Sequence, residues 1–367
     1  MFIEKIDRDA LLKPLQTVVG IVERKQPLPI LSNVLIEKSN ASIRFTATDL
    51  EIQISTNQAM EIGAETGSVT VSAKKFQEIL RVLPDASKVS LDIQESKLLI
   101  KANKSRFSLQ TLPAQDFPVV SNQLENATKI AIKQGLLKKL LGLVQYAMAQ
   151  QDIRYYLNGV LLVIEGSIIR LIATDGHRLA YVSSKLDSEY AKHEVILSRK
   201  TVNELSKLLS DAEETVTLEL AEKQVRLSFA EIVLTSKVID GKFPDYERVI
   251  PNYTNHLLLD RITILQALQR AAILSNEKFR GVRFVLTEKN LRIISSNSEQ
   301  EEAQEDIEND YHGPALDIGF NVNYLLDGLN NTPAQNVTFS FGDPNSSILI
   351  TVPGEDEFKY VVMPMRI

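Results

Sequence analysis

Apolar residues recur at two different spacings along the chain, and these spacings predict where helices and strands lie. Between residues 134 and 150 they recur every three or four positions, as on one face of a helix: Leu136, Leu140, Leu143, Val144 and Ala147. Residues 88–93 and 215–220 alternate apolar with polar side chains, which is typical of half-buried antiparallel strands. We predict helices at residues 10–22, 74–83, 134–150, 199–209, 262–276 and 322–329.

The same order of elements occurs three times. Val34, Val160 and Val282 each precede a polar pair by fourteen residues, and the pairs are Thr48-Asp49, Thr174-Asp175 and Ser296-Asn297. The copies are offset by 126 residues (34 to 160, 48 to 174) and then by 122 (160 to 282, 174 to 296). Solenoid repeats are about 20–50 residues long, so this pattern predicts a whole domain present three times. We place the domains at residues 1–126, 127–252 and 253–367, each α+β with antiparallel strands and two helices.

Composition narrows the class of protein. The 367 residues are 44% hydrophobic and 24% charged, as in ordinary globular proteins. The sequence lacks a long apolar run and a signal-peptide pattern, so we expect a cytoplasmic protein. With no cysteine, disulfides and thiolate metal sites are excluded. A net charge of −6 alone argues weakly against nucleic acid as a partner.

The distribution of charge changes this picture. The helices predicted at 10–22, 134–150 and 262–276 open the three copies, and none of them contains an acidic residue. This favours a shared positive field, although short core helices often carry few charges. The helices at 74–83 and 199–209 begin with Lys74-Lys75 and Arg199-Lys200, cations that oppose the helix dipole. We therefore expect them to serve something other than helix stability.

The size of the predicted domains limits how many of them are needed to surround a duplex. A domain of about 120 residues is roughly 35 Å across. Three in a closed ring leave a hole of only about 5 Å, whereas six leave about 35 Å, enough for a duplex roughly 20 Å wide. A ring around a duplex would therefore need two chains, in the closed cyclic arrangement that is commonest among assemblies. The three domains could equally lie as separate beads.

Candidate catalytic chemistry is weak. Asp175, His177 and Ser183-Ser184 could form a hydrolase triad, but the Gly-x-Ser-x-Gly pattern is missing. A phosphate-binding loop is missing as well, and the acidic run 299–310 lacks the glycine-containing calcium loop. We expect no enzyme activity, no cofactor and no metal.

Two segments fit binding better. Arg154-Tyr155-Tyr156 follows the basic helix and could contact sugar-phosphate or stack on bases, or the tyrosines could be ordinary strand residues. The C-terminal residues 360–367 include two methionines and a proline, which suit an adaptable peptide-binding surface or a final sheet strand.

Seven segments taken together resemble the bacterial sliding clamp, the β subunit of the replicative DNA polymerase (DNA polymerase III). They are Leu28-Pro29-Ile30-Leu31, Thr48-Asp49-Leu50-Glu51, residues 151–159 (Gln-Asp-Ile-Arg-Tyr-Tyr-Leu-Asn-Gly), residues 173–180 (Ala-Thr-Asp-Gly-His-Arg-Leu-Ala), Phe243-Pro244-Asp245-Tyr246, residues 271–281 and the Met-Pro-Met-Arg ending. The resemblance implies a head-to-tail homodimeric ring of six clamp domains, with antiparallel sheets outside and helices inside. Such a ring slides on duplex DNA, tethers the polymerase, is loaded by an ATP-driven clamp loader, and has no catalytic activity or cofactor.

The resemblance also implies a pocket, between the second and third domains, for short linear peptides of polymerases, the clamp loader and repair proteins. The matching positions are Leu157, Thr174, Gly176, His177, Arg178, Leu179, Pro244, Arg248, Val249, Asn321, Tyr324, Val361, Val362, Met363, Pro364, Met365 and Arg366. His177, Arg178 and Arg248 would form polar edges, and the apolar walls would come from Leu157, Leu179, Val249, Val362 and Met363. His177 is then a pocket residue and not a general base.

Two further sets of residues follow from the resemblance. The subunit interface would join Phe107 and Leu109 to Ile273 and Leu274, with Lys75 and Arg106 facing Glu299, Glu301 and Glu302. DNA contacts would come from Arg24, Lys25, Gln151, Tyr155, Tyr156, Arg199 and Lys200. Glu23 departs from the family pattern, which often has Gly-Gly-Arg here, and leaves open which of Arg24 and Lys25 contacts phosphate. Alternative functions are an open three-domain DNA-binding protein and, more remotely, the hydrolase.

Overall fold

The structure is a computed structural model that describes residues 2–23, 28–60, 66–120, 124 and 126–367. The chain divides into two compact units, Met1–Leu137 with Asn203–Val238, and Lys138–Val202 with Ile239–Ile367. The division passes through two helices of the central copy, so each unit holds one terminal copy of the repeat and part of the central one.

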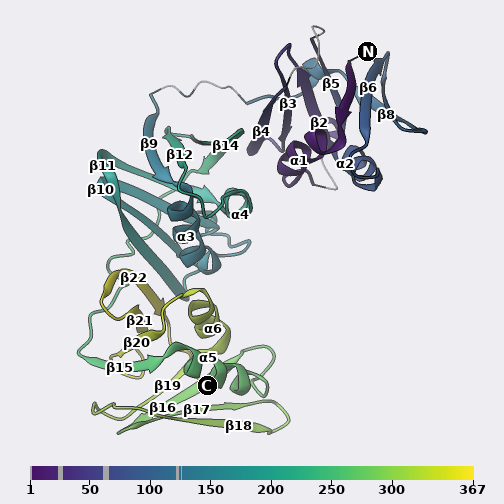
Figure 1. The fold of residues 1–367 in the computed structure, drawn as a ribbon. Coiled ribbons are helices and arrows are strands. Elements are labelled where there is room, and N and C mark those ends of the chain that lie inside the picture. Colours follow the sequence, from purple (N-terminus) through teal and green to yellow (C-terminus); the bar gives the residue numbers. More distant parts are fainter. Residues whose placement is uncertain (1, 24–27, 61–65, 121–123, 125) are drawn as a thin grey trace. The chain divides into compact units, whose positions relative to one another are not determined.

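The first copy packs two helices on one face of antiparallel sheet (Figure 1). Leu11, Leu15, Phe76 and Leu80 of these helices are fully buried. The elements are β1 (Ile3–Asp7), α1 (Arg8–Val19), η1 (Pro29–Ser32), β2 (Asn33–Lys38), β3 (Ser42–Thr48), β4 (Ile52–Ala59), β5 (Gly67–Ser72), α2 (Ala73–Val82), β6 (Lys88–Gln94), β7 (Lys97–Ala102), β8 (Ser105–Leu112) and η2 (Ala114–Asp116).

The central copy repeats this order with fewer, longer strands, because β10 and β11 each run through two of the strand positions of the first copy. Register irregularities between Ile164 and Ile168 mark where the first copy turns instead. The elements are β9 (Thr128–Lys133), α3 (Gln134–Val144), η3 (Gln145–Ala147), η4 (Tyr155–Leu157), β10 (Gly159–Thr174), β11 (Arg178–Ser198), α4 (Arg199–Leu208), β12 (Thr215–Leu220), β13 (Gln224–Phe229) and β14 (Ile232–Ile239).

The third copy contains two sheets. One is the four-stranded sheet β18-β17-β16-β19, and the other joins β15, β20, β21 and β22. The elements are β15 (Asn255–Asp260), α5 (Arg261–Ala272), β16 (Gly281–Thr287), β17 (Asn290–Ser296), β18 (Glu302–Glu308), β19 (Leu316–Asn321), α6 (Val322–Asn331), β20 (Asn336–Phe341), β21 (Ile348–Val352) and β22 (Glu355–Val362). The predicted α+β class, with helices at the six predicted places, is confirmed.

The polar pair that marks each copy forms a turn held by its own side chain. Asp49 Oδ1 and Asp175 Oδ1 each accept hydrogen bonds from the main-chain N–H groups two and three residues later, at 2.8–3.1 Å. Asn297 Oδ1 accepts from the N–H groups two and four residues later, both at 3.0 Å. Asp and Asn favour such turns because the short side chain replaces a main-chain acceptor. The sequence repeat is thus a repeat of local structure.

The opening helices end earlier than the periodicity predicts, at Val19, Val144 and Ala272. In the third copy, Ile273, Leu274 and Ser275 donate to carbonyl groups only three residues back, at 3.2–3.3 Å. The chain therefore tightens into a 3₁₀ turn after each helix, as helix ends commonly do, while the apolar pattern continues.

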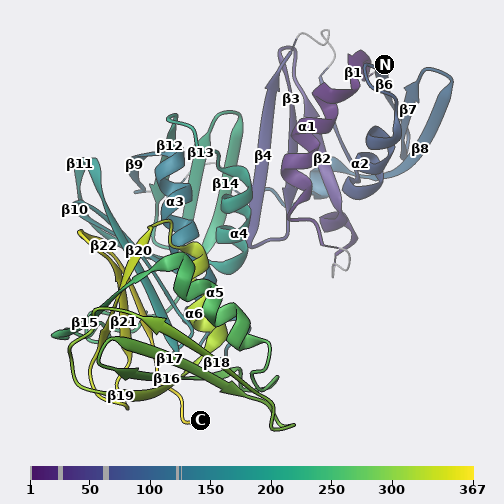
Figure 2. The ribbon, with the colours of Figure 1, turned by 60° about the horizontal axis from the view of Figure 1, so that its bottom comes forward.

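Consecutive copies are joined strand to strand in one register. In the first unit β4 pairs with β14, from Ile52 opposite Ser236 to Thr56 opposite Ile232. In the second unit β11 pairs with β22, from Arg178 opposite Val362 to Val182 opposite Phe358. Each partner is displaced by 126 residues (52 to 178, 232 to 358). We call these the first and second junctions; Figure 2 shows β4 beside β14 and β11 beside β22.

Candidate functional site

The guanidinium of Arg178 holds the second junction together from inside. Its Nε donates to Asp175 at 3.1 Å, Nη1 to Asp327 at 2.5 Å, and Nη2 to the carbonyl oxygen of Tyr146 at 2.7 Å. The guanidinium carbon also lies 4.5 Å from the centre of the Tyr324 ring. Burial alone would lower the pKa of Arg178, but the surrounding tyrosine and carboxylate groups outweigh it and raise the pKa. Arg178, whose side chain is 9% exposed, is an internal link and not the polar edge that we predicted.

The residues around Arg178 form a ring of contacts between the central and third copies. His177 stacks on Tyr324, with ring centres 6.4 Å apart and an angle of 18° between planes. The hydroxyl of Tyr360 donates to the carbonyl oxygen of Tyr324 at 2.8 Å, and its ring packs edge-on against Tyr146. Burial raises the pKa of both Tyr360 and Tyr146 above the ordinary tyrosine value. The Asp175 carboxylate bonds to main-chain N–H groups and to Arg178, which leaves the triad hypothesis without a contact to support it.

Most of the predicted apolar walls are core residues. Leu157, Leu179, Val361 and Val362 are each at most 2% exposed. The first three belong to a cluster that also contains Ala149, Leu161, Val163, Ile172, Ile196 and Phe243, flanked by Tyr156, Tyr181, Ile239, Tyr246, Ile250 and Leu349. The predicted pocket residues that reach the surface are Gly176, His177, Pro244, Arg248, Val249, Met363 and Arg366, with Asn321, Tyr324, Pro364 and Met365 partly covered and Thr174 buried.

Sequence reasoning missed Tyr146, Asp327 and Tyr360. Asp327 is the sixth residue of α6, and Glu204 is the sixth residue of α4. This shared acid is the signal that could have identified it, since a buried Arg178 requires an acidic partner. Tyr146 and Tyr360 carried no comparable signal.

The candidate DNA-contacting loop is rigidly built. The Asp152 carboxylate accepts hydrogen bonds from the Arg154 side chain at 3.0 and 2.8 Å. The Asn158 side chain accepts a hydrogen bond from the main-chain N–H of Asp152 and donates one to its carbonyl oxygen. Gln151 and Tyr155 are exposed, while Tyr156 is half-buried and contacts Tyr155 edge-on. The loop thus presents an amide and an aromatic ring at its surface, which is chemistry suited to sugar and phosphate.

The other predicted DNA contacts differ among themselves. Arg199 donates to the carbonyl oxygens of Met148 and Ala149 at 2.7–3.1 Å, and burial lowers its pKa. This main-chain role explains a cation at the start of α4, where the sequence alone suggested a functional requirement. Lys200 is half-buried. Arg24 and Lys25 lie outside the residues that the structure describes.

The predicted interface residues lie on strand edges and nearby surfaces. Lys75, Arg106, Glu299, Glu301 and Glu302 are exposed. Phe107, Leu109 and Leu274 are half-buried, and Ile273 is 77% exposed. Ile273 is thus an apolar side chain that packing within one chain leaves largely uncovered.

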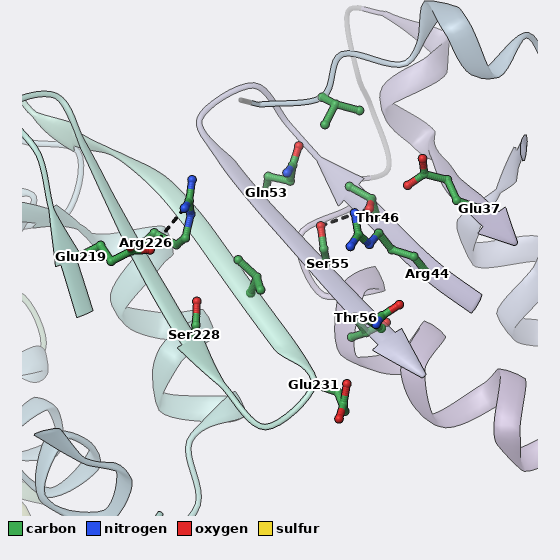
Figure 3. A pocket seen from close by; sticks show the side chains of 13 residues that line it. Glu37, Arg44, Thr46, Gln53, Ser55, Thr56, Glu219, Arg226, Ser228 and Glu231 are labelled. Carbon is green, nitrogen blue, oxygen red and sulfur yellow. Dashed lines mark hydrogen bonds and ion pairs between the residues drawn. The ribbon is translucent and has the colours of Figure 1, made fainter. Parts of the chain in front are cut away.

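The first junction carries a polar pocket of about 240 Å³ (Figure 3). Arg226 donates to Glu219 at 3.2 Å on one side, and the hydroxyl groups of Thr46 and Ser55 lie 3.1 Å apart on the other. The lining residues carry both charge signs, with Glu37, Arg44 and Glu231 in addition to the ion pair. This mixture gives the pocket no clear preference for one ligand charge.

Two kinds of site are absent from the described part of the chain. Its His, Asp and Glu side chains form no group of three or more that could hold a metal ion. Among the same residues, no helix has the length and apolar content needed to cross a bilayer.

Comparisons with known proteins agree over the whole chain. Models of the N-terminal, central and C-terminal domains of the DNA polymerase III beta subunit match residues 1–121, 131–245 and 247–366. The beta sliding clamp of Pseudomonas putida is 46% identical over 364 residues, and that of Escherichia coli K12 is 41% identical over 363, with 99% of each chain covered. A crystal structure of the Pseudomonas aeruginosa sliding clamp bound to griselimycin has a TM-score of 0.95 at 44% identity, covering 100% of both chains. The Caulobacter crescentus clamp has a TM-score of 0.94 at 38% identity, covering 99% of this chain and 100% of its own. The chain therefore belongs to the DNA polymerase III beta subunit family and is a DNA sliding clamp.

Proposed function

We propose that two copies of this chain close head to tail into a ring around duplex DNA, hold the polymerase to it, and catalyse no reaction. The ring would act in the cytoplasm, where a clamp loader opens it and repair proteins share its partner site. The observation that supports closure best is the shared register of the two junctions. A third junction of the same kind would use one edge of the third copy and one of the first.

The two strand edges required for that junction are β18 and β8. Within the described residues, β18 pairs only with β17, and residues 105–110 of β8 pair only with β7. Glu302 of β18 is structurally equivalent to Leu179 of β11, because each pairs with the residue just before the turn-forming Asn297 or Asp175. Ser105 of β8 is equivalent to Ile232 of β14, because each is the first paired residue after the tight turn of its hairpin. The register then places Ala303 opposite Phe107, and Gln304 opposite Arg106.

Charge and apolar area fit this pairing. Arg106 and Lys104 are exposed on or beside β8, whereas Glu302 lies on β18 and Glu301 and Glu299 lie just before it. Exposed Ile273 and half-buried Leu274 would be covered by Phe107 and Leu109 of the other copy. An apolar centre with a complementary charged rim is the usual form of a specific interface.

The ring is tested by its topology. Loaded on closed circular DNA, the protein should stay bound at high salt and be lost when the DNA is cut. Ordinary phosphate contacts weaken steeply with salt and do not depend on whether the DNA is circular. Retention on linear DNA would contradict the ring and favour an open DNA-binding protein.

The register is tested by charge exchange. We expect Arg106→Glu to weaken the dimer by sedimentation, and Glu302→Arg in the same chain to restore part of it, because the two residues lie diagonally across the proposed pair. Lys185→Glu, on exposed β11 surface, is the matched control and should leave the dimer unchanged. Failure of the exchange in a protein that still dimerises would contradict the register.

The partner site is proposed at the surface residues of the second junction, with Met363, His177, Val249 and Pro244 forming the contact area. Griselimycin binds the P. aeruginosa clamp, and we propose that it binds here at the same surface. Titration calorimetry with Met363→Ala should show weaker binding, while Met60→Ala, far along the chain in the first copy, should not. Equal affinity of both variants would contradict this location.

DNA contacts are proposed for Gln151, Tyr155, Tyr156, Arg24, Lys25 and Lys200, with Arg199 acting mainly on the main chain of Met148 and Ala149. Replacement of Tyr155 by alanine should shorten the residence of the ring on circular DNA without changing the dimer. An unchanged residence time would remove Tyr155 from the contact set.

A further inference from the structure

The last residues of the chain are fixed at two points. The N–H of Met363 donates to the carbonyl oxygen of His177 at 2.9 Å, and the N–H of Met365 donates to the carbonyl oxygen of Gly319 at 2.8 Å. Pro364, between them, has no N–H to donate, and proline is tolerated at a sheet edge for that reason. The tail therefore spans from the central copy to β19, and Met363 lies at the first of the two attachments.

Beneath the tail, two glycines face the same side of neighbouring strands. Gly281 on β16 pairs with Asn321, and Gly319 on β19 pairs with Arg283. Residues 281 and 283 share one side of β16, so the two glycines do too. The opposite side carries Val282 and Phe320, which are fully buried. We call Gly281 and Gly319 the glycine cradle.

The cradle is occupied by the chain end. A Cβ atom on Gly319 would lie 2.5 Å from the carbonyl oxygen of Met365 and 2.7 Å from the Ile367 side chain. A Cβ atom on Gly281 would lie 3.2 Å from the Ile367 side chain and reach no main-chain atom of the tail. Any side chain at 319 must displace the tail itself, whereas one at 281 displaces only the terminal isoleucine.

We propose that the glycine cradle anchors the chain end and so positions Met363 for partner binding at the second junction. The inference rests on the partner site proposed above. Ile367 acts as the anchor, the Met365–Gly319 bond fixes the direction of the tail, and Met363 is held at the surface beside His177. A preordered tail raises affinity because a partner does not have to immobilise it on binding.

The first test is griselimycin affinity by calorimetry. Gly319→Val should weaken binding roughly tenfold, since immobilising each flexible side chain has a cost comparable with a tenfold step in Kd. Gly281→Ala and Ile367→Gly should each weaken it about threefold, and the double variant should be no weaker than either, because both remove one contact. Gly142→Ala, at a helical glycine with open space around it, is the control and should bind as the native chain.

The second test reads the tail without a ligand. In NMR spectra of protein labelled with ¹³C-methyl methionine, the Met363 and Met365 signals of Gly319→Val should become narrower and move toward the chemical shifts of a free chain. In Gly142→Ala both signals should stay unchanged. Additive losses in the Gly281→Ala, Ile367→Gly pair, or unaltered methionine signals in Gly319→Val, would overturn the proposal. If the native chain fails to bind griselimycin, the partner site is contradicted for that ligand, while the methionine signals still decide whether the cradle orders the tail.

Discussion

The first and second junctions have the same strand pairing, but they differ in the side chains at the pairing strands and in those that cover them. Both join two copies by antiparallel pairing in equivalent register. Where the second has Arg178 and Leu179, the first has Ile52 and Gln53. The buried guanidinium therefore occurs at the second junction only, although both junctions carry an acid at the positions of Asp175 and Asp327, namely Asp49 and Glu204 at the first.

The side chains that pack over the paired strands also differ between the two junctions. Phe117 and Phe243 are buried at equivalent positions, but at the second junction Tyr246 packs on Tyr181 with ring centres 6.0 Å apart. At the first, Gln53 accepts a hydrogen bond from the N–H of Val120 at 2.8 Å, beside a pocket lined by hydroxyl groups and ion pairs. Backbone pairing joins the copies at both junctions, whereas the partner site that we propose uses apolar and aromatic side chains that occur at the second junction.

The acidic residue at the sixth position of α4 and of α6 also has a different role in each copy. Asp327 pairs with Arg178, while Glu204 pairs with Lys207 on its own helix at 2.7 Å. One position thus serves the link between copies at the second junction and a local ion pair in the central copy.

The largest effect is expected from removing the internal link. Arg178→Ala removes three hydrogen bonds, to Asp175, Asp327 and the Tyr146 carbonyl group. Because Asp327 is 44% exposed, we expect roughly 1–1.5 kcal/mol from each bond and about 3–4 kcal/mol of unfolding free energy in all. Chemical denaturation should show the loss as a lower midpoint. Arg248→Ala, whose side chain is 87% exposed in its pair with Asp245, should cost at most about 1 kcal/mol. Equal effects would mean that Arg178 does not carry the junction.

The next effect compares equivalent positions directly. Leu179→Ala should cost about 3 kcal/mol, because a buried leucine leaves a cavity in the cluster. Gln53→Ala should cost about 1 kcal/mol, the usual value of one hydrogen bond. Denaturant midpoints of the two variants give the comparison. A larger loss at Gln53 would show that the polar junction is the stronger one.

A smaller effect tests the packing of Tyr360. A Cβ atom on Gly328, in α6, would lie 2.4 Å from the Tyr360 ring. Gly328→Ala should therefore cost about 1–2 kcal/mol, since overpacking outweighs the gain in helix propensity. Gly142→Ala in α3 meets no atom within 4 Å and should stabilise the protein by up to about 1 kcal/mol. Changes of the same sign in thermal midpoint would contradict this account.

The fold could be predicted largely from local patterns. The three copies, the α+β class and the six helices followed from spacing, because apolar periodicity and Asx turns are local properties. Helix ends were overestimated, since the apolar pattern continues into the 3₁₀ turns after Val144 and Ala272. The register of the junctions was not predictable, because it depends on pairing between residues some 180 positions apart (52 and 236).

The resemblance selected residues that the structure brings together around the second junction, but it did not predict their burial. It assigned Arg178 to a polar edge and Leu179 to a wall. Both are interior groups, and a sequence pattern cannot separate a side chain that lines a surface from one directly beneath it. Asp175 lies three residues before Arg178, but the two other partners of Arg178 lie 32 residues before it and 149 after it (146 and 327), beyond any local spacing rule.

The smallest effect concerns pH at the loop beside the second junction. Hydrogen bonds from Arg154 lower the pKa of Asp152 from 3.8 to about 2. A carboxylate with a lowered pKa stabilises the fold above its unfolded value, and this contribution is lost as the pH falls from about 4 to about 2. Arg154→Ala should return the Asp152 carboxyl titration, followed by ¹³C NMR, toward 3.8. Asp306, whose pKa is lowered to about 2 by hydrogen bonds from Asn290, Arg292 and Gln304, is the internal control and should not change.

The position equivalent to Arg154 at the first junction is Leu28 (154 to 28), so this pH response should belong to the second junction alone. Titration of Asp152 near 3.8 in the native chain would show that Arg154 does not order the loop.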